Sequence, residues 1–331
     1  YDPAHLSAAG AADPSLIDTL APPSTAQQAY EIAALAVLPN GTKKLLEYVV
    51  APVQFNLNLD SPLTIPGTVG SFSGGNSANY KIDGIDGQGA APAVPGCNPN
   101  SAGGPAVAVS NGTSATTVDN GYPRPANYTG NDCSYYSGNK GCVGNATLPN
   151  SMDSPAALQQ TLQTIAQNSN VCLGTNVGSQ GCPGQGGGTY SFANIVSALP
   201  GGTWPNAATN PQVVYVNGDL DISGNNPGSG ILVVTGNLTY DGLSNWNGII
   251  LVVGQGTTTF NINGGGSGQF NGAIFVATTE AANGTLLPNF GTADYNVNGG
   301  GGSGLYYNSC WINTVQKPVT YQILSFREIS Q

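Results

Sequence analysis

Charged side chains are scarce in this chain of 331 residues: Asp, Glu, Lys and Arg make up only 7% of it. In an average soluble domain they make up about a quarter. The cations are also unevenly placed, because neither Lys nor Arg occurs between Lys140 and Lys317. A nucleic acid or an anionic membrane surface is bound through clustered cations. We therefore expect no nucleic-acid partner and no membrane-surface partner.

Long apolar runs are also missing. No stretch approaches the roughly 20 apolar residues of a membrane-spanning helix, so we expect no membrane span. The sequence starts at Tyr1 with neither an initiator Met nor a signal peptide, and we expect a processed or trimmed product. Disorder is a poor interpretation, since 40% of the residues are hydrophobic and many are β-branched, whereas disordered chains are usually rich in charge.

Catalytic side chains are few. The single histidine, His5, lies near the N-terminus, so neither a serine nor a cysteine nucleophile has a nearby imidazole. Asp219 and Asp221 lie two residues apart on one face of a predicted strand, where they offer half of a glycosidase or Ca²⁺ site or simply a solvated face. Asp83 and Asp86 in KIDGIDG are further Ca²⁺ candidates. We expect no enzyme activity and no cofactor beyond such structural Ca²⁺.

Six cysteines in a chain rich in Gly and Asn indicate disulfides and an oxidising compartment. The absence of a CxxC motif and the single histidine argue against zinc. Two candidate pairs are close in sequence and each encloses a Gly-rich loop: Cys133 with Cys142, and Cys172 with Cys182. The remaining pair, Cys97 with Cys310, would tie the early chain to the last coil. Sequence alone leaves the connectivity open.

The N-terminal part divides in two. Residues 1–29 are rich in Ala and Pro and have too little apolar surface to fold alone, so we expect an extended arm. Residues 30–53 contain two apolar runs separated by the turn sequence PNGT, which predicts a β-hairpin. The arm carries spaced apolar side chains suited to docking on another surface; these are Leu6, Leu16, Ile17 and Leu20, with Tyr30 at its end.

Residues 54–331 are predicted to form one β-solenoid domain, because apolar strands recur between residues 211 and 312. The first intervals are 18 residues, from Val213 to Ile231 and from Ile231 to Ile249, and most apolar runs are followed by Gly and an alternating strand. Such a repeat fits one rung of a parallel β-helix, with Gly and Asn at the corners. An antiparallel β-sandwich is the alternative, since its strands have similar spacing.

A loop and helix insertion is predicted at about residues 111–205. Two short helices are expected within it. The first starts at Pro155 after a cap from Asp153 or Ser154, and the second follows a cap from Ser191. The fold class is therefore mainly β: a parallel β-helix with an N-terminal arm, a hairpin and two short helices.

Several segments of the sequence resemble a known family. The run VVYVNGDLDISG, GILVVTGNLTYDG, GIILVVGQGTTTFNING and FNGAIFVATT is similar to the C-terminal region of PilX-like pilus-assembly proteins, which are type IV pilin-related. The segments AYEIAALAVLPNGTKKLLEYVVAP, SPLTIPGT and NSANYKIDGIDG resemble the preceding part of the same proteins. The resemblance covers about half of the chain and implies an exported protein of the bacterial cell surface. The family's hydrophobic N-terminal helix is not part of this sequence.

Glycosylation is a further prediction for an exported chain. Asn-X-Ser/Thr sequons mark candidate acceptors for N-linked glycans. A chain this rich in Asn, Ser and Thr contains several by chance. The six candidates are Asn40, Asn111, Asn127, Asn145, Asn237 and Asn283.

These observations favour a non-enzymatic structural subunit of an extracellular, pilus-like filament. Its expected partners are copies of itself in a head-to-tail polymer, joined by the arm or by stacked solenoid ends. One alternative is a carbohydrate-binding adhesin that presents Trp204 and Trp246 to surface glycans. A polysaccharide-cleaving β-helix enzyme is the other alternative.

Overall fold

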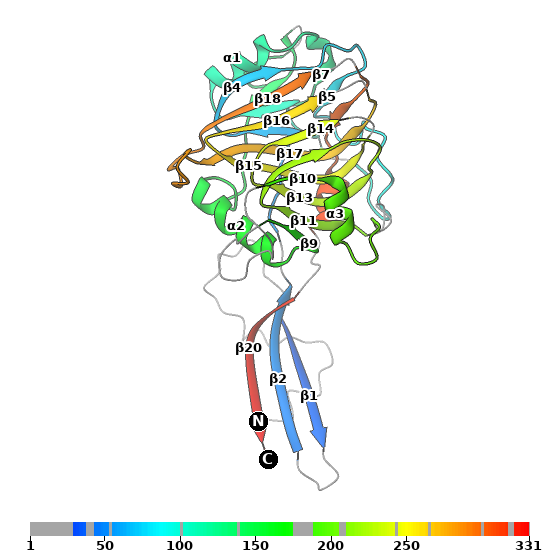
Figure 1. Ribbon diagram of the computed structural model, residues 1–331, viewed down its shortest axis with the longest axis vertical. Coiled ribbons are helices and arrows are strands. Elements are labelled where there is room, and N and C mark those ends of the chain that lie inside the picture. The colour runs from blue at the N-terminus through cyan, green and yellow to red at the C-terminus, as the bar shows by residue number, and fades with distance from the viewer. Residues whose placement is uncertain are drawn as a thin grey trace. The chain divides into compact units, whose positions relative to one another are not determined.

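The computed structural model describes residues 29–37, 43–52, 55–99, 102–137, 140–174, 188–204, 210–241, 244–263, 266–298, 301–316 and 321–330. The chain divides into two compact units. Unit 1 comprises residues 1–54 and 317–331, and unit 2 comprises residues 55–316. Both are mainly β, as the sequence predicts (Figure 1). The predicted arm lies outside the described residues except for its last residue. Within the described ranges, no helix is both long and apolar enough to cross a membrane.

Unit 1 contains a three-stranded antiparallel sheet in the order β1–β2–β20 (Figure 1). Its strands are β1 (Tyr30–Val37), β2 (Lys43–Pro52) and β20 (Tyr321–Ser330). The two strands of the predicted hairpin pair with each other from Tyr30↔Val50 to Val37↔Lys43. The third strand was not anticipated, because the sequence assigned residues 317–331 to the β-solenoid. They belong to unit 1 instead, since β20 pairs with β2 along almost its whole length.

Unit 2 contains two sheets in which every pairing of named strands is parallel. The small sheet has the order β10 (Gly188–Ser191), β12 (Gly218–Ile222), β14 (Leu238–Asp241), β16 (Thr257–Asn263), β18 (Thr292–Asn298), β4 (Thr68–Ser73). The large sheet has the order β7 (Tyr128–Thr129), β5 (Lys81–Asp83), β19 (Gly304–Tyr306), β17 (Gln269–Glu280), β15 (Trp246–Gln255), β13 (Gly228–Val234), β11 (Gln212–Val216), β9 (Val171–Leu173). Three further strands branch from β17: β3 (Leu63–Ile65) pairs with β17, β6 (Val107–Val109) pairs with β3, and β8 (Val143–Asn145) pairs with β6.

Successive strands from β9 to β19 alternate between the large and the small sheet. The 18-residue interval appears directly in the register, where Val213 lies beside Ile231 and Ile231 beside Ile249. These parallel pairings exclude the antiparallel sandwich. The early strands then extend the same sheets, since β3 pairs with β17 and β4 with β18. The predicted insertion at 111–205 is therefore wrong in part, because β7, β8, β9 and β10 belong to the two sheets.

The hydrophobic core of unit 2 lies between the two sheets and takes alternate residues from each strand. We call this cluster the inter-sheet core. Phe260 and Tyr295 of the small sheet pack in it at 5.5 Å between ring centroids. The repeated apolar runs predict that either these residues or their alternating neighbours face the interior, and the structure places the following in the inter-sheet core: Val214, Val216, Leu232, Val234, Ile250, Val252, Ile274 and Val276.

The outer face of the large sheet is buried as well. Val213, Ile231 and Ile249 alternate with the inter-sheet core residues and are at most 2% exposed. Helices α2 (Pro155–Gln167) and α4 (Ser309–Val315) pack on this sheet. Burial on both faces explains why these strands read as unbroken apolar runs rather than as alternating ones.

Two further helices, α1 (Gly112–Asn120) and α3 (Phe192–Ala198), complete the unit, together with a 3₁₀ turn at Pro125–Asn127. The predicted helices are α2 and α3, and Ser154 caps α2 through a hydrogen bond from the N–H of Ala157. Helices α1 and α4 were missed. The sequence of α1, GTSATTVDN, consists mostly of residues that disfavour helix, so only the cap at Asn111 marks it.

Candidate assembly surface

Large apolar side chains on the surface gather on unit 1. Eight of them are exposed among the described residues, and seven lie on β1 and β20. The eighth, Ile85, is 37% exposed in unit 2. The seven are Tyr30, Ile32, Leu35, Val37, Ile323, Leu324 and Phe326. Contiguous exposed apolar surface on a folded protein marks an interaction site, whereas single residues such as Ile85 need no explanation.

Both faces of the β1–β2–β20 sheet are apolar because apolar residues occupy odd and even positions of its strands. On one face, the register places Ile32, Tyr48 and Phe326 side by side, with the last two rings 4.8 Å apart. On the other, Leu35 lies beside Leu45. The alternation in YQILSFREIS was the sequence signal for β20, but the strand has no neighbour close in sequence to pair with.

Two ion pairs lie within this sheet. The Lys44 ammonium lies 2.9 Å from Glu328, and the Arg327 guanidinium lies 2.5 Å from Glu47. The hydrogen bond to Glu47 and its charge raise the pKa of Arg327. Each pair is at least partly exposed and therefore contributes little to stability. The charges of the three strands also cancel, so the sheet has weak electrostatic protection against self-association; they are Glu31, Lys43, Lys44, Glu47, Arg327 and Glu328.

The outer strands of the sheet are long. Among the described residues these are β1 and β20, with 8 and 10 residues, and each pairs with a named strand, β2, on one side only. Natural proteins blunt such edges with Lys, Pro or very short strands. β1 has neither Lys nor Pro, and its sequence is YEIAALAV.

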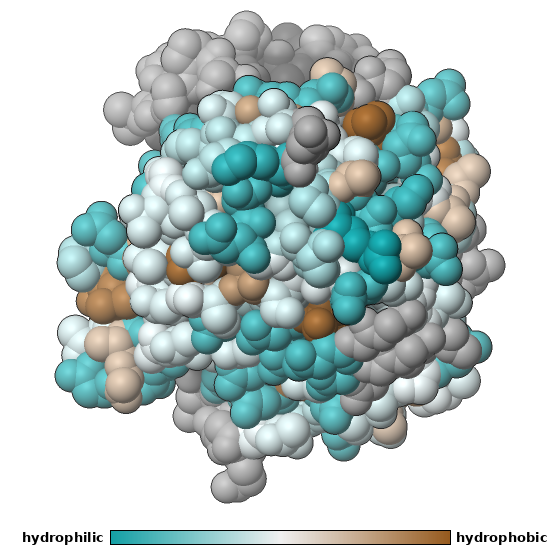
Figure 2. Space-filling model, turned by 90° about the horizontal axis from the view of Figure 1, so that it is seen from above, coloured by the Kyte–Doolittle hydropathy of each residue, from teal (hydrophilic) through white to brown (hydrophobic). Residues whose placement is uncertain are grey.

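The ends of unit 2 are constructed in the opposite way. The outermost strands there are shorter, from 2 residues in β7 to 6 in β4, and β4 is covered by α1. Val118 of α1 and Ile195 of α3 insert into the inter-sheet core from its two ends. Figure 2 looks onto the α1 end, where hydrophilic and near-neutral atoms predominate and strongly hydrophobic ones are isolated.

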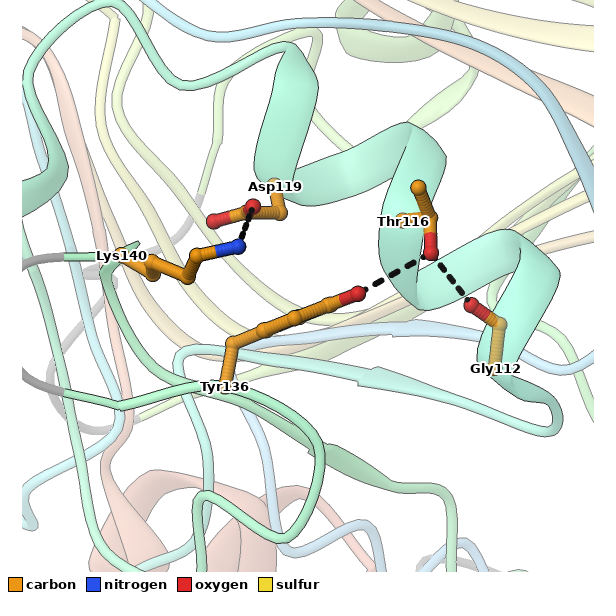
Figure 3. Close-up of polar contacts among 5 residues, drawn as sticks. All are labelled: Gly112, Thr116, Asp119, Tyr136 and Lys140. Atoms are coloured by element: carbon orange, nitrogen blue, oxygen red, sulfur yellow. Dashed lines mark hydrogen bonds and ion pairs between the residues drawn. The ribbon is translucent and has the colours of Figure 1, made fainter.

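A second layer of contacts holds α1 in place. The Lys140 ammonium lies 3.2 Å from Asp119, and the Tyr136 hydroxyl lies 3.0 Å from that of Thr116. Figure 3 shows both contacts. The Thr116 hydroxyl in turn donates to the carbonyl of Gly112. The Cys133–Cys142 disulfide closes the loop that carries Tyr136 and Lys140, so the partner of these polar contacts with α1 is restrained.

Two of the three candidate disulfides lie wholly within the described residues. Cys133 is bonded to Cys142, and Cys97 to Cys310. Cys172 is also disulfide-bonded, whereas Cys182 lies outside the described residues. The Cys97–Cys310 bond links positions 213 residues apart and fastens α4 to an early loop.

The candidate Ca²⁺ ligands do not converge. Asp86 accepts hydrogen bonds from the N–H and the hydroxyl of Ser309 at 2.8 and 2.6 Å, which places it at the start of α4. Asp83 accepts from the N–H of Ile85 in a local turn. Asp219 and Asp221 face outward from β12, as predicted, and Asp219 accepts from the N–H of Asn237. No group of three metal-ligating side chains occurs in the described ranges.

The sequons differ in how their side chains are used. The Asn127 amide nitrogen donates to three carbonyls, with the shortest contact 2.8 Å to Tyr80, so it has no room for a glycan. Asn111 caps α1 through its side-chain oxygen. Three other candidates are exposed on the surface: Asn145, Asn237 and Asn283. Asn40 lies outside the described residues.

The other residues predicted from the sequence are those of the arm and the two tryptophans. The arm residues Leu6, Leu16, Ile17 and Leu20 lie outside the described ranges. The aromatic platform predicted for an adhesin is wrong: Trp246 is 2% exposed and packs edge-on against Trp204, at 5.5 Å between centroids. Trp246 belongs to the inter-sheet core, and Trp204 is partly buried and packs against it.

Comparison of the chain with protein-family models, with curated proteins and with solved structures finds no match in any of the three.

Proposed function

We propose that this protein is a structural subunit of an extracellular, self-assembling surface filament and that it assembles through the β1–β2–β20 sheet. The observation that carries the proposal is the concentration of exposed apolar side chains on β1 and β20. A sheet with apolar faces, balanced charges and long outer strands is suited to association with another chain. Its partner in this proposal is a second copy of the same chain.

We also propose that unit 2 is a parallel β-helix that serves as the body of the subunit. Alternation of strands between two parallel sheets, with an 18-residue register, supports this fold. Each rung has too little apolar surface to be stable alone, and stacking makes the inter-sheet core continuous. Such a body is rigid and needs no catalytic group, in keeping with a non-enzymatic role.

Stacking of solenoid ends is the less favourable mode of assembly. Helices α1 and α3 close the inter-sheet core, and the edge strands beside them are short. Capped ends of this kind prevent polymerisation in repeat proteins. The disulfides support an oxidising location such as the cell exterior, as does the resemblance to PilX-like surface proteins.

The test replaces single apolar side chains on the proposed surface by lysine. Leu35→Lys and Ile323→Lys change residues that are 61% and 62% exposed, so the fold of the subunit tolerates them. Ile85→Lys is the matched control in unit 2. We expect the unmodified chain to form oligomers in light scattering and filaments in negative-stain electron microscopy. The two unit 1 variants should be monomeric, while the control assembles normally.

Two results would contradict the proposal. One is a monomeric unmodified chain at high concentration. The other is equal loss of assembly in Ile85→Lys and Leu35→Lys, which would indicate a general effect of added charge.

A further inference from the structure

A polar hollow opens at a corner of unit 2 where the chain passes from the large to the small sheet. Its volume is about 310 Å³, and it is bordered by three consecutive turns of the chain. The residues at its rim that carry polar side chains are Asp219, Thr235, Asn237, Gln255 and Thr257. A volume of this size is at the lower end of small-molecule sites.

The side chains around the hollow are held in place by the backbone. The Asp219 carboxylate accepts from the N–H of Asn237 at 2.7 Å, and the Asn237 side-chain oxygen accepts from the N–H of Thr259 at 2.9 Å. The Thr235 hydroxyl donates to Asn217, and the Gln255 amide donates to the carbonyl of Ala282. Because each contact uses one atom of the side chain, the second Asp219 oxygen and the Asn237 amide nitrogen are left for a ligand. Fixed side chains bind with a small loss of conformational entropy.

The hollow continues into the outer face of the small sheet. Register places Thr259 beside Asp294, whose carboxylate accepts from the N–H of Ser71, so one polar column crosses the sheet. Neighbouring strands are about 4.8 Å apart. In the described part of this face, every outward side chain on the strands is Ser, Thr, Asn or Asp; these are Thr68, Ser71, Ser73, Thr189, Ser191, Asp219, Asp221, Thr239, Thr257, Thr259, Asn261, Asn263, Thr292, Asp294, Asn296 and Asn298.

This chemistry selects the class of ligand. Lys and Arg are absent from the outward positions just given, and the three Asp side chains make the face acidic, which disfavours phosphate and acidic polysaccharides. Large apolar and aromatic side chains are absent there as well, which disfavours lipids and apolar peptides. What remains is a ligand with many neutral hydroxyl groups, since carboxylates accept hydrogen bonds from such groups and amides both donate to and accept from them.

We propose that the hollow binds one or two sugar units of a neutral polysaccharide, whose chain continues along the polar face. Asp219 accepts from sugar hydroxyls, Asn237 donates to them, and Thr257 does either. Binding here does not depend on assembly through unit 1. Asn237 is also a sequon, so a glycan attached there would occupy the same hollow and exclude the ligand.

The test uses the full chain made in a bacterial periplasm, where disulfides form and sequons are not modified. Cellohexaose, chitohexaose and maltohexaose are the neutral probes, polygalacturonate is the acidic probe, and Ca²⁺ is added alone in a third series. Affinities are measured by calorimetry and by ligand-observed NMR. We expect at least one neutral probe to bind, with polygalacturonate and Ca²⁺ inactive.

Variants assign the site. Asp219→Asn retains the acceptor for the Asn237 N–H, and Thr257→Val changes an exposed hydroxyl, so both preserve the fold. Each should weaken binding about tenfold, equivalent to the loss of one hydrogen bond to a charged or polar group. The control Asp153→Asn makes the same chemical change beside a second hollow of about 310 Å³ and should bind as the unmodified chain does.

Three outcomes would overturn the proposal: none of the neutral probes binds, both site variants bind with unchanged affinity, or polygalacturonate binds as tightly as the neutral probes. Ca²⁺ binding that disappears in Asp219→Asn, without any sugar binding, would assign the hollow to a cation and equally overturn it.

Discussion

The side-chain oxygen of Gln316 accepts a hydrogen bond from the backbone N–H of Leu57 at 2.5 Å, although 259 residues separate the two in sequence. The Gln316 amide nitrogen donates to the side chain of Asn58 at 3.0 Å and to the carbonyl of Ile312 at 3.1 Å. One side chain at the end of α4 thus joins the first and the last described segments of unit 2. Their proximity explains how unit 2 can interrupt unit 1 between β2 and β20 in the sequence.

Replacing Gln316 should therefore loosen the closure of unit 2. Gln316→Ala removes one acceptor and two donor contacts, and we expect the free energy of unfolding to fall by about 1–2 kcal/mol. Urea denaturation followed by circular dichroism measures the change. Gln160→Ala, at an exposed position on α2, is the control and should change stability by less than about 0.5 kcal/mol. Equal effects of the two variants would show that the contacts of Gln316 contribute nothing specific.

The two disulfides should differ in their contribution to stability. Cys97–Cys310 spans 213 residues and Cys133–Cys142 spans 9. In the loop-entropy treatment, closing the longer loop stabilises by about 5 kcal/mol and closing the shorter by about 3 kcal/mol. We expect the double variant Cys97→Ser/Cys310→Ser to lose more stability than Cys133→Ser/Cys142→Ser in urea titrations. The reverse order would mean that the α1 cap, rather than the attachment of α4, limits unfolding.

Part of this structure is readable from the sequence because it depends on local pattern. The repeated runs around Val214, Leu232 and Ile250 identified the strands, although they left open which alternate residues face inward, and Ser154 and Ser191 marked helix starts. The neighbours of the early strands could not be read in the same way. β4 pairs with β18, more than 200 residues later in the sequence, and no local signal encodes so distant a pairing.

The candidate sites were predicted less well for a related reason. The assembly surface depends on β20, whose partner β2 lies near the other end of the chain. The aromatic platform failed because Trp246 is buried in the inter-sheet core beside Trp204, a contact that sequence spacing does not show. The sequence did identify Asp219 as outward-facing, since its neighbour Leu220 takes the interior position, but it gave no indication of the hollow beside it.

Asp60 should make the stability of unit 2 depend on pH. Burial raises the pKa of this carboxyl above its ordinary value of 3.8, and the nearby charge of Asp132 raises it further. A raised pKa in the folded state gives a stabilising contribution that is full below the unfolded value and is lost as the pH rises through the folded value. At neutral pH the folded chain therefore holds a carboxylate that would be better protonated.

Removing that charge should stabilise the protein. We expect Asp60→Asn to raise the melting temperature at neutral pH and to have no effect below the unfolded pKa, where Asp60 is protonated in both states. Differential scanning calorimetry across this pH range measures the difference. Asp153→Asn is the exposed control. A stabilisation that persists unchanged in acid would show that it comes from packing rather than from ionisation.

The close approach of neighbouring strands in the large sheet can be tested at a column of glycines. Gly230, Gly248 and Gly272 lie side by side on β13, β15 and β17, with φ values of +126°, +131° and +144°. A Cβ at position 248 would adopt a strained conformation and collide with the carbonyl oxygen of Gly230 on the neighbouring strand. Gly248→Ala should therefore cost about 3 kcal/mol or more, or abolish folding.

The control for backbone strain alone is Gly284, which also has a positive φ, +81°. A methyl group added there would meet no atom within 4 Å, so Gly284→Ala should cost only about 1 kcal/mol. Urea titration of the two variants separates backbone strain from the close approach of the strands, and equal costs would show that the strands are not packed as tightly as this column requires.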